Sequence, residues 1–98
     1  MNKLAKDIKC FRALAEPLRI KLLQVIHEQD EMCVCVLTER FKMSQSKLSY
    51  HLKLLLDAEL INMYSSSKWN FYSINIKTLQ RIFSPAMIDK ILNTTNNS

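Results

Sequence analysis

The sequence predicts a mainly helical α+β domain of the winged helix-turn-helix class, with elements in the order α-α-α-α-β-β-α. Two short segments with helical periodicity, residues 34–41 and 44–56, are separated by only two residues, and such a tight connection is typical of a helix-turn-helix. Two segments rich in β-branched and aromatic residues, 60–64 and 69–74, follow directly and predict a β-hairpin, the wing. An amphipathic helix is left over at each end of the chain, and we expect the two terminal helices to form a dimer surface.

The chain of 98 residues is long enough for about one domain, which we assign to residues 1–92, with a frayed polar tail at residues 93–98. A domain this small buries little more than ~60% of the surface that its unfolded chain exposes, so we expect a second copy to stabilise it. No apolar run reaches the ~18 residues of a membrane span, and no signal peptide is evident, so we expect a cytoplasmic protein that does not bind membranes.

The net charge of +5, from 14 basic and 9 acidic residues, favours an anionic partner such as nucleic acid. The chain has no glycine, which excludes the glycine-rich loops that bind nucleotide phosphates. Its three cysteines are Cys10, Cys33 and Cys35. An odd number of cysteines in an expected cytoplasmic protein argues against a disulfide scaffold and favours metal binding, redox chemistry or packing.

The two N-terminal helices are predicted from their apolar spacing and start signals. The first, over residues 3–14, has an apolar stripe of Leu4, Ile8, Phe11 and Leu14. Pro17 suits the first turn of a second helix, which is expected to end near Glu28.

The remaining elements follow from caps and turn residues. Ser44 is a good N-cap for the helix over residues 44–56, and Leu48, Leu52 and Leu55 share its apolar face. Polar residues 65–68 predict the turn of the hairpin. The last helix is expected over residues 77–92, where Pro85 either kinks it or splits it in two.

The polar face of the helix over residues 44–56 is the candidate DNA-reading surface. No acidic residue lies between Phe41 and Leu56, and this pattern suits a helix that enters a groove lined by phosphates. Amide and hydroxyl side chains there can bond base edges, and lysines can bond phosphates. The alternative is that this polar face is simply exposed to solvent and has no binding role. His51 also fits a half-buried structural role. The predicted DNA-binding residues are Ser44, Gln45, Ser46, Lys47, Ser49, Tyr50, His51, Lys53 and, at the hairpin tip, Lys68.

Cys33 and Cys35 lie at the start of the first helix of the helix-turn-helix, and thiolates are soft ligands for Cu(I), zinc, cadmium or trivalent arsenic and antimony. Residues two apart in a regular helix point about 200° apart, whereas in an extended segment they point to the same side. We therefore expect that both sulfurs can bind one ion only if the first helical turn is extended or unwound, which would compete with DNA binding. The alternative is that both cysteines are small buried apolar residues.

Four segments together resemble the ArsR/SmtB family of metal-responsive repressors. The segment EMCVCVL at residues 31–37 resembles the family's metal box ELCVCDL, and QSKLSYHLKLL at 45–55 resembles its recognition helix. FRALAEPLR at 11–19 is similar to the family's opening motif, and KWNFY at 68–72 to its wing. The resemblance implies a homodimeric repressor with no permanent cofactor, bound to an inverted-repeat operator in double-stranded DNA. It also implies that trivalent arsenic or antimony releases the repressor through three sulfurs, two of them from Cys33 and Cys35.

The sequence departs from the family pattern at several positions. Val36 replaces the aspartate of the metal box, which removes an oxygen ligand and favours a thiophilic ion. Thr38 stands where the arsenic sensors have a third cysteine, so Cys10 is the candidate third ligand, in cis or from the partner chain; packing at the dimer helix is its alternative role. No histidine follows His51, so the family's C-terminal zinc site is not expected. Glu59 stands where a glycine usually ends the recognition helix, and a positive φ is expected there.

We therefore predict a repressor that trivalent arsenic or antimony releases from DNA. Three alternatives stay open: a repressor of the same fold that senses oxidants, persulfide or another thiophilic metal (Cd, Zn, Cu) through its cysteines; a metal buffer; and an enzyme. The enzyme alternative would pair Cys33 with His27 or His51, but nothing in the sequence supplies an oxyanion site, so we expect no enzyme.

Overall fold

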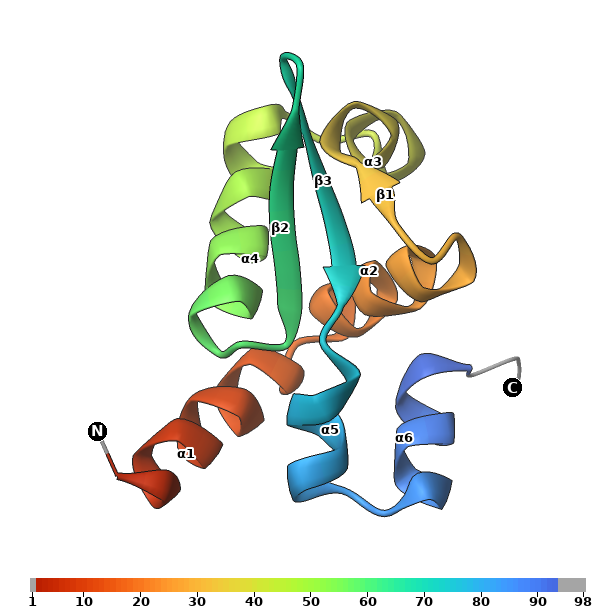
Figure 1. Ribbon diagram of the computed structural model, residues 1–98. Helices are drawn as coiled ribbons and strands as arrows, with labels where there is room; N and C mark the ends of the chain where they lie inside the picture. Colours follow the sequence, from red (N-terminus) through yellow and green to blue (C-terminus); the bar gives the residue numbers. More distant parts are fainter. Residues whose placement is uncertain (1, 94–98) are drawn as a thin grey trace.

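The computed structural model describes residues 2–93 and confirms the predicted winged helix-turn-helix, with one added strand and a divided C-terminal helix (Figure 1). The remaining residues of the predicted tail, 94–98, lie outside the described part. The elements are α1 (Lys3–Leu14), α2 (Pro17–Glu28), β1 (Met32–Cys33), α3 (Val34–Phe41), α4 (Gln45–Asp57), β2 (Ile61–Ser66), β3 (Trp69–Ile74), α5 (Ile76–Ile82) and α6 (Pro85–Leu92).

Short polar caps set where the helices begin. Ser44 caps α4, and its hydroxyl accepts a hydrogen bond from the Lys47 amide at 3.2 Å, as predicted. The expected C-terminal helix is split rather than kinked: Phe83 is extended, Ser84 caps the next helix, and Pro85 occupies its first position. Proline is favourable there because the missing amide hydrogen has no partner within a helix.

The sheet has the strand order β1-β3-β2, with both pairs antiparallel. The strand β1 was not predicted, because two residues are too short to show an alternating pattern. It pairs Met32 with Tyr72 and Cys33 with Phe71, which joins the cysteine segment directly to the wing.

One hydrophobic core holds the helix-turn-helix, the sheet and the terminal helices together. The predicted apolar face of α4 is confirmed, since Leu48, Leu52 and Leu55 are buried. The side chains with the least exposure come from several helices and from the segment before β2, namely Leu22, Leu23, Ile26, Leu37, Leu48, Leu52, Leu55, Leu60, Leu79 and Cys10.

Four residues other than glycine adopt positive φ in the described chain: Asp30, Lys42, Glu59 and Ser67. Glu59, with φ of 61°, confirms the positive φ expected at the end of α4. Ser67 adopts a similar φ of 60° at the hairpin tip. Because the chain has no glycine, these turns are formed by residues for which the left-handed region of φ and ψ costs about 1–3 kcal/mol each.

Candidate DNA interface and sulfur pair

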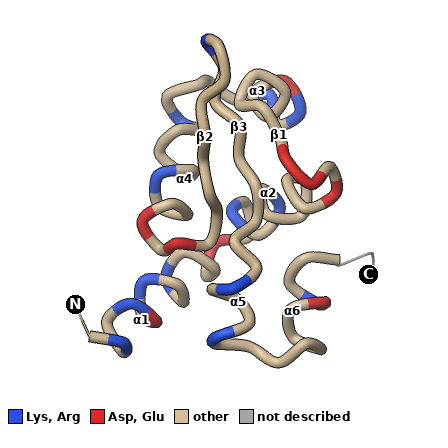
Figure 2. Tube along the Cα trace, viewed as in Figure 1, with Lys and Arg blue, Asp and Glu red and all other residues tan. Residues whose placement is uncertain are grey.

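The polar face of α4 is exposed and carries no carboxylate before Asp57, its last residue, as a DNA-reading face requires. Ser44, Gln45, Ser46, Lys47 and Ser49 are all exposed, and Tyr50 has 61% of its surface exposed. The N-terminal half of α4 and the tip of the β2–β3 hairpin lie at the same end of the molecule (Figure 1). Lysine marks that tip, whereas the acidic residues of this region lie at the C-terminal end of α4 (Figure 2). A phosphate backbone could therefore approach the N-terminal half of α4 and the hairpin tip at once without meeting a carboxylate.

Two predicted phosphate-binding lysines already have contacts within the chain. Lys53 Nζ lies 3.4 Å from a carboxylate oxygen of Asp57, and Lys68 Nζ lies 5.6 Å from the centre of the Trp69 ring. Both lysines are exposed, and exposed ion pairs are worth little, so neither contact prevents a move to a phosphate.

His51 is placed differently from the other predicted DNA-binding residues. It is half-buried, and its Nδ1 lies 3.1 Å from Arg19 Nη1. Burial, with the neighbouring Arg19 charge, lowers the pKa of His51 below its ordinary value, so the ring is neutral and Nδ1 accepts from Arg19. Arg19 also donates to the Ala13 carbonyl at 2.8 Å and so links α1, α2 and α4. Sequence reasoning did not identify Arg19 as a partner of His51.

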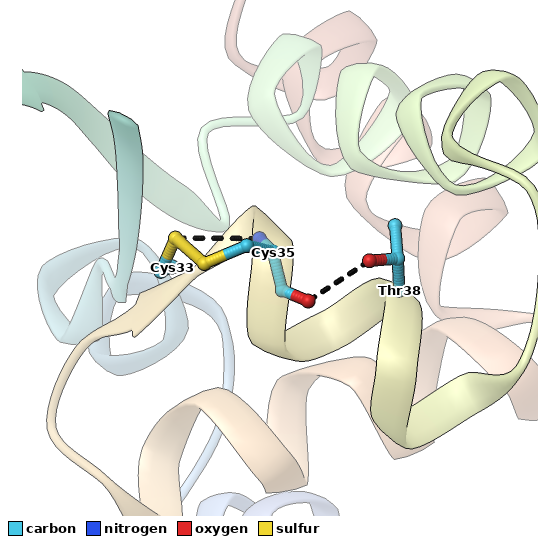
Figure 3. The surroundings of a disulfide bond; sticks show 3 residues. All are labelled: Cys33, Cys35 and Thr38. Carbon is cyan, nitrogen blue, oxygen red and sulfur yellow. Dashed lines mark hydrogen bonds between the residues drawn. A yellow bond between two sulfur atoms is a disulfide. The ribbon is translucent and has the colours of Figure 1, made fainter. Parts of the chain in front are cut away.

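The structure brings Cys33 and Cys35 together in a disulfide without unwinding α3 (Figure 3). Cys33 is the extended N-cap residue of α3, with φ of −75° and ψ of 142°, and Cys35 lies in the first turn. The Cys35 amide donates to Cys33 Sγ at 3.3 Å. Cys33 is extended, as expected for two sulfurs that meet, but it lies just before the helix, so α3 is helical from Val34 and no turn of it is unwound.

The surroundings of the sulfur pair supply no third ligand within the chain. The Thr38 hydroxyl donates to the Cys35 carbonyl at 2.9 Å (Figure 3). Cys10 lies on α1, fully buried, and its thiol donates to the Ala58 carbonyl at 3.2 Å. Burial raises the pKa of Cys10, with smaller opposing effects from Arg81. No group of three His, Cys, Asp or Glu side chains suited to a metal ion occurs among residues 2–93, so Cys10 does not join the pair in this conformation.

The sulfur pair fits a soft, thiophilic ion of low coordination number. Two sulfurs are adjacent, Cys35 is exposed, and Val36 occupies the position where a carboxylate would favour zinc or cadmium. Cys33 is buried and Cys35 is exposed, so an ion would reach the two sulfurs from the side of Cys35.

A chain of contacts that sequence reasoning missed leads from Cys33 to the wing. Cys33 is the strand partner of Phe71, and the Phe71 ring stacks on Tyr64 with the ring centres 5.3 Å apart. The Tyr64 hydroxyl in turn donates a hydrogen bond to Glu31 Oε1, with 2.7 Å between the two oxygens. Glu31 lies two residues before Cys33. No local pattern could reveal this, since Glu31 and Tyr64 are 33 positions apart.

The terminal helices α1, α5 and α6 lie at the end of the molecule opposite the hairpin tip (Figure 1). On α1, Leu4, Ile8 and Phe11 have 66%, 41% and 47% of their surface exposed. An ion pair of 2.9 Å between Arg81 and Asp7 fixes α5 to α1. No helix in the described part of the chain is long and apolar enough to cross a membrane.

A helix-turn-helix whose second helix has a polar face without acidic residues before its last position, flanked by a two-stranded wing, defines the class of winged helix-turn-helix DNA-binding regulators. A family model described as "Bacterial regulatory protein, arsR family" matches residues 16–63, which span the helix-turn-helix. The chain belongs to this family and is a transcriptional repressor of the ArsR type. Proteins of this fold and family are transcription regulators rather than enzymes.

Two relatives and one solved structure illustrate the similarity. An "Arsenical resistance operon repressor" of Bacillus subtilis is 42% identical over 74 residues, which cover 76% of this chain and 70% of the relative. A "Cadmium resistance transcriptional regulatory protein CadC homolog" of Staphylococcus aureus is 26% identical over 97 residues, covering 90% and 80%. The structure of HlyU from Vibrio cholerae superposes with a TM-score of 0.72 at 27% identity, covering 93% of this chain and 97% of that one.

Proposed function

We propose that the protein binds, as a homodimer, an inverted-repeat operator, and that trivalent arsenic or antimony releases it by binding the thiolates of Cys33 and Cys35. The observation that carries this proposal is the adjacency of the two sulfurs at the start of the helix-turn-helix, where Cys33 belongs to a strand that pairs with the wing. The arsenical resistance name of the Bacillus subtilis relative supports the choice of ion.

In the proposed complex, the N-terminal half of α4 enters the major groove. Gln45, Ser46, Ser49 and Tyr50 would reach base edges, since these exposed side chains can donate and accept hydrogen bonds. Phosphates would be held by Lys47, Lys53 and, from the wing, Lys68, with Ser44 at the start of α4. His51, which is half-buried and bonded to Arg19, would support the fold instead. In a symmetric dimer the two helices would dock ~34–36 Å apart. Binding to an operator would place the protein in the cytoplasm.

The dimer would form through the terminal helices. The exposed apolar side chains of α1 lie away from the proposed reading face, so a second copy can cover them without blocking DNA. Burial of such side chains is favourable by about 25 cal/mol per Å² of apolar surface.

The ion would act mainly through two sulfurs of this chain. When reduced, Cys33 and Cys35 offer two soft donors, and Val36 stands where a carboxylate would favour ions that prefer oxygen. Cys10 would have to leave its buried site and its bond to Ala58 to become the third ligand, so its contribution is expected to be small unless the dimer rearranges α1.

Release would follow from movement of β1. An ion bound to both thiolates of the reduced chain would tie Cys33 in β1 to Cys35 in α3 and so act on the position of β1. Because Cys33 pairs with Phe71, its displacement would pass to β3 and the wing. By linkage, DNA weakens ion binding as much as the ion weakens DNA binding, typically by ~1–3 kcal/mol.

A gel shift with the protein's own promoter DNA, under reducing conditions, tests the proposal. We expect arsenite to release the wild-type protein, while Cys33→Ser and Cys35→Ser bind DNA normally and no longer respond. Cys10→Ser is the matched control and should respond like the wild type. Release of both serine variants by arsenite would contradict the assignment of the sulfurs, and release by cadmium or zinc instead of arsenite would assign a different ion.

A further inference from the structure

Cys33 and Cys35 lie close enough together to form a disulfide with each other. The Cα atoms of Cys33 and Cys35 are 5.3 Å apart, within the range of about 4.4–6.8 Å that disulfides span. Cys33 reaches this position as an extended N-cap residue, and Cys35 is exposed at the start of α3. A small oxidant can therefore reach one sulfur while the other is held beside it.

Closing the pair leaves the DNA-binding elements in place. With the disulfide present, α3 is helical from Val34, β1 keeps its register with β3, and Ser44 caps α4. The polar face of α4 and the hairpin tip remain at the same end of the molecule. The oxidised chain thus has the conformation in which the proposed reading face is assembled.

We propose that the Cys33–Cys35 pair is a redox gate on ion sensing: a peroxide or a small disulfide oxidises it, and the oxidised repressor stays on DNA and no longer responds to arsenite. With hydrogen peroxide, two thiols lose two protons and two electrons, one S–S bond forms, and the peroxide becomes two waters. With a small disulfide, thiol exchange yields two small thiols. The sulfurs of a disulfide have no thiolate to offer an ion. This inference rests on the proposed function, since it concerns regulation of the same site.

Cys10 does not compete for the bond. Its side chain has no exposed surface and its thiol is bonded to the Ala58 carbonyl of a different part of the fold. Oxidation of the folded protein should therefore consume two thiols and leave the third.

The test uses the full chain carrying Cys10→Ser, treated with hydrogen peroxide and then freed of oxidant and reductant. We expect thiol titration and intact mass to show loss of two thiols and two hydrogens, and we expect operator affinity to change less than about twofold. The arsenite concentration needed for half release should rise at least about tenfold. Dithiothreitol should restore the original response, and the same treatment of Cys35→Ser should produce no intramolecular disulfide.

Two outcomes would overturn the gate: loss of operator binding on oxidation, which would indicate an oxidant sensor, or unchanged arsenite release from the oxidised protein. If arsenite fails to release even the reduced protein, the proposed function fails. The gate is then tested by whether arsenite protects the reduced Cys33–Cys35 pair from alkylation. Protection would show that the ion binds the two thiolates that oxidation removes, and so supports the gate. Lack of protection would overturn the gate.

Discussion

At the scale of single residues, Arg19 and His51 show how a side chain on a candidate reading helix can serve the fold instead. The Arg19 guanidinium donates to the Ala13 carbonyl and approaches His51 Nδ1, so the end of α1 and the middle of α4 share one donor. A protonated ring could not accept from Arg19 and would place two positive charges side by side. The neutral ring is therefore part of the folded structure.

This contact predicts a loss of stability on acidification. Burial and Arg19 lower the pKa of folded His51, so between the folded and the unfolded pKa the unfolded chain binds more protons. The stabilising contribution is complete above the unfolded pKa of about 6.5 and is lost as pH falls from there to the folded pKa. Urea unfolding at several pH values should show a weaker decline below pH ~6.5 for His51→Gln than for the wild type. Equal declines would show that His51 is not responsible.

Some residue roles could be predicted from local sequence and others could not. The cap at Ser44 and the positive φ at Glu59 depend on neighbours within a few positions, and both predictions are confirmed. The Arg19–His51 contact joins residues 32 positions apart, so only the packing of α2 on α4 reveals it. The start of α3 at Val34 was predicted, but the pairing of Cys33 in β1 with β3 joins distant parts of the chain, which the local sequence does not show.

At the scale of elements, periodicity predicted every helix that has a long apolar stripe, whereas β1 escaped detection. Its two residues become a strand only because β3 provides an unpaired edge next to them. This small strand is nevertheless the element that joins the sulfur pair to the wing. The mechanism that we propose is therefore movement of this strand, in place of the unwinding of the first helix that the sequence led us to expect.

The contact between Tyr64 and Glu31 is expected to transmit that movement. Tyr64→Phe removes the hydroxyl that bonds Glu31 but keeps the ring stacked on Phe71. We expect operator affinity without arsenite to stay within about twofold, while the factor by which arsenite weakens DNA binding falls about two- to fivefold. Fluorescence anisotropy titrations with and without arsenite measure both quantities. Glu31→Gln, which keeps an acceptor oxygen, is the matched control, and an unchanged factor in Tyr64→Phe would place the route elsewhere.

At the scale of the whole molecule, the distribution of acidic residues separates the wing from the rest of the chain. No acidic residue occurs from Leu60 to Ile88, so the wing is free of carboxylates. A net charge of +5 alone would not distinguish a DNA-binding protein from many other basic proteins, and basic residues lie on most helices (Figure 2). What distinguishes the N-terminal half of α4 and the hairpin tip is that Lys47 and Lys68 lie there without a neighbouring acid in the sequence.

The placement of charge predicts a specific change in salt dependence. Each phosphate contact adds about 0.9 to the slope of log affinity against log salt concentration. Lys47→Ala should therefore reduce the slope by about one for each protomer and weaken binding to operator and unrelated DNA alike. Lys77→Ala, an exposed lysine on α5 at the opposite end, should leave the slope unchanged. A slope that Lys77→Ala reduces as much as Lys47→Ala does would contradict the proposed orientation on DNA.

The apolar side chains of α1 predict that operator binding depends on a dimer. Leu4 and Ile8 are exposed in the single chain, so replacing them should not open a cavity in its core. The double variant Leu4→Asp, Ile8→Asp should be monomeric by light scattering and should keep its thermal unfolding as a folded chain at high protein concentration. It should lose most operator affinity, because a monomer places only one reading helix on a half-site. Val36→Asp, an exposed apolar position on α3, should remain dimeric. A double variant that still dimerises would exclude this face of α1 and direct attention to the exposed apolar surface of α5 and α6.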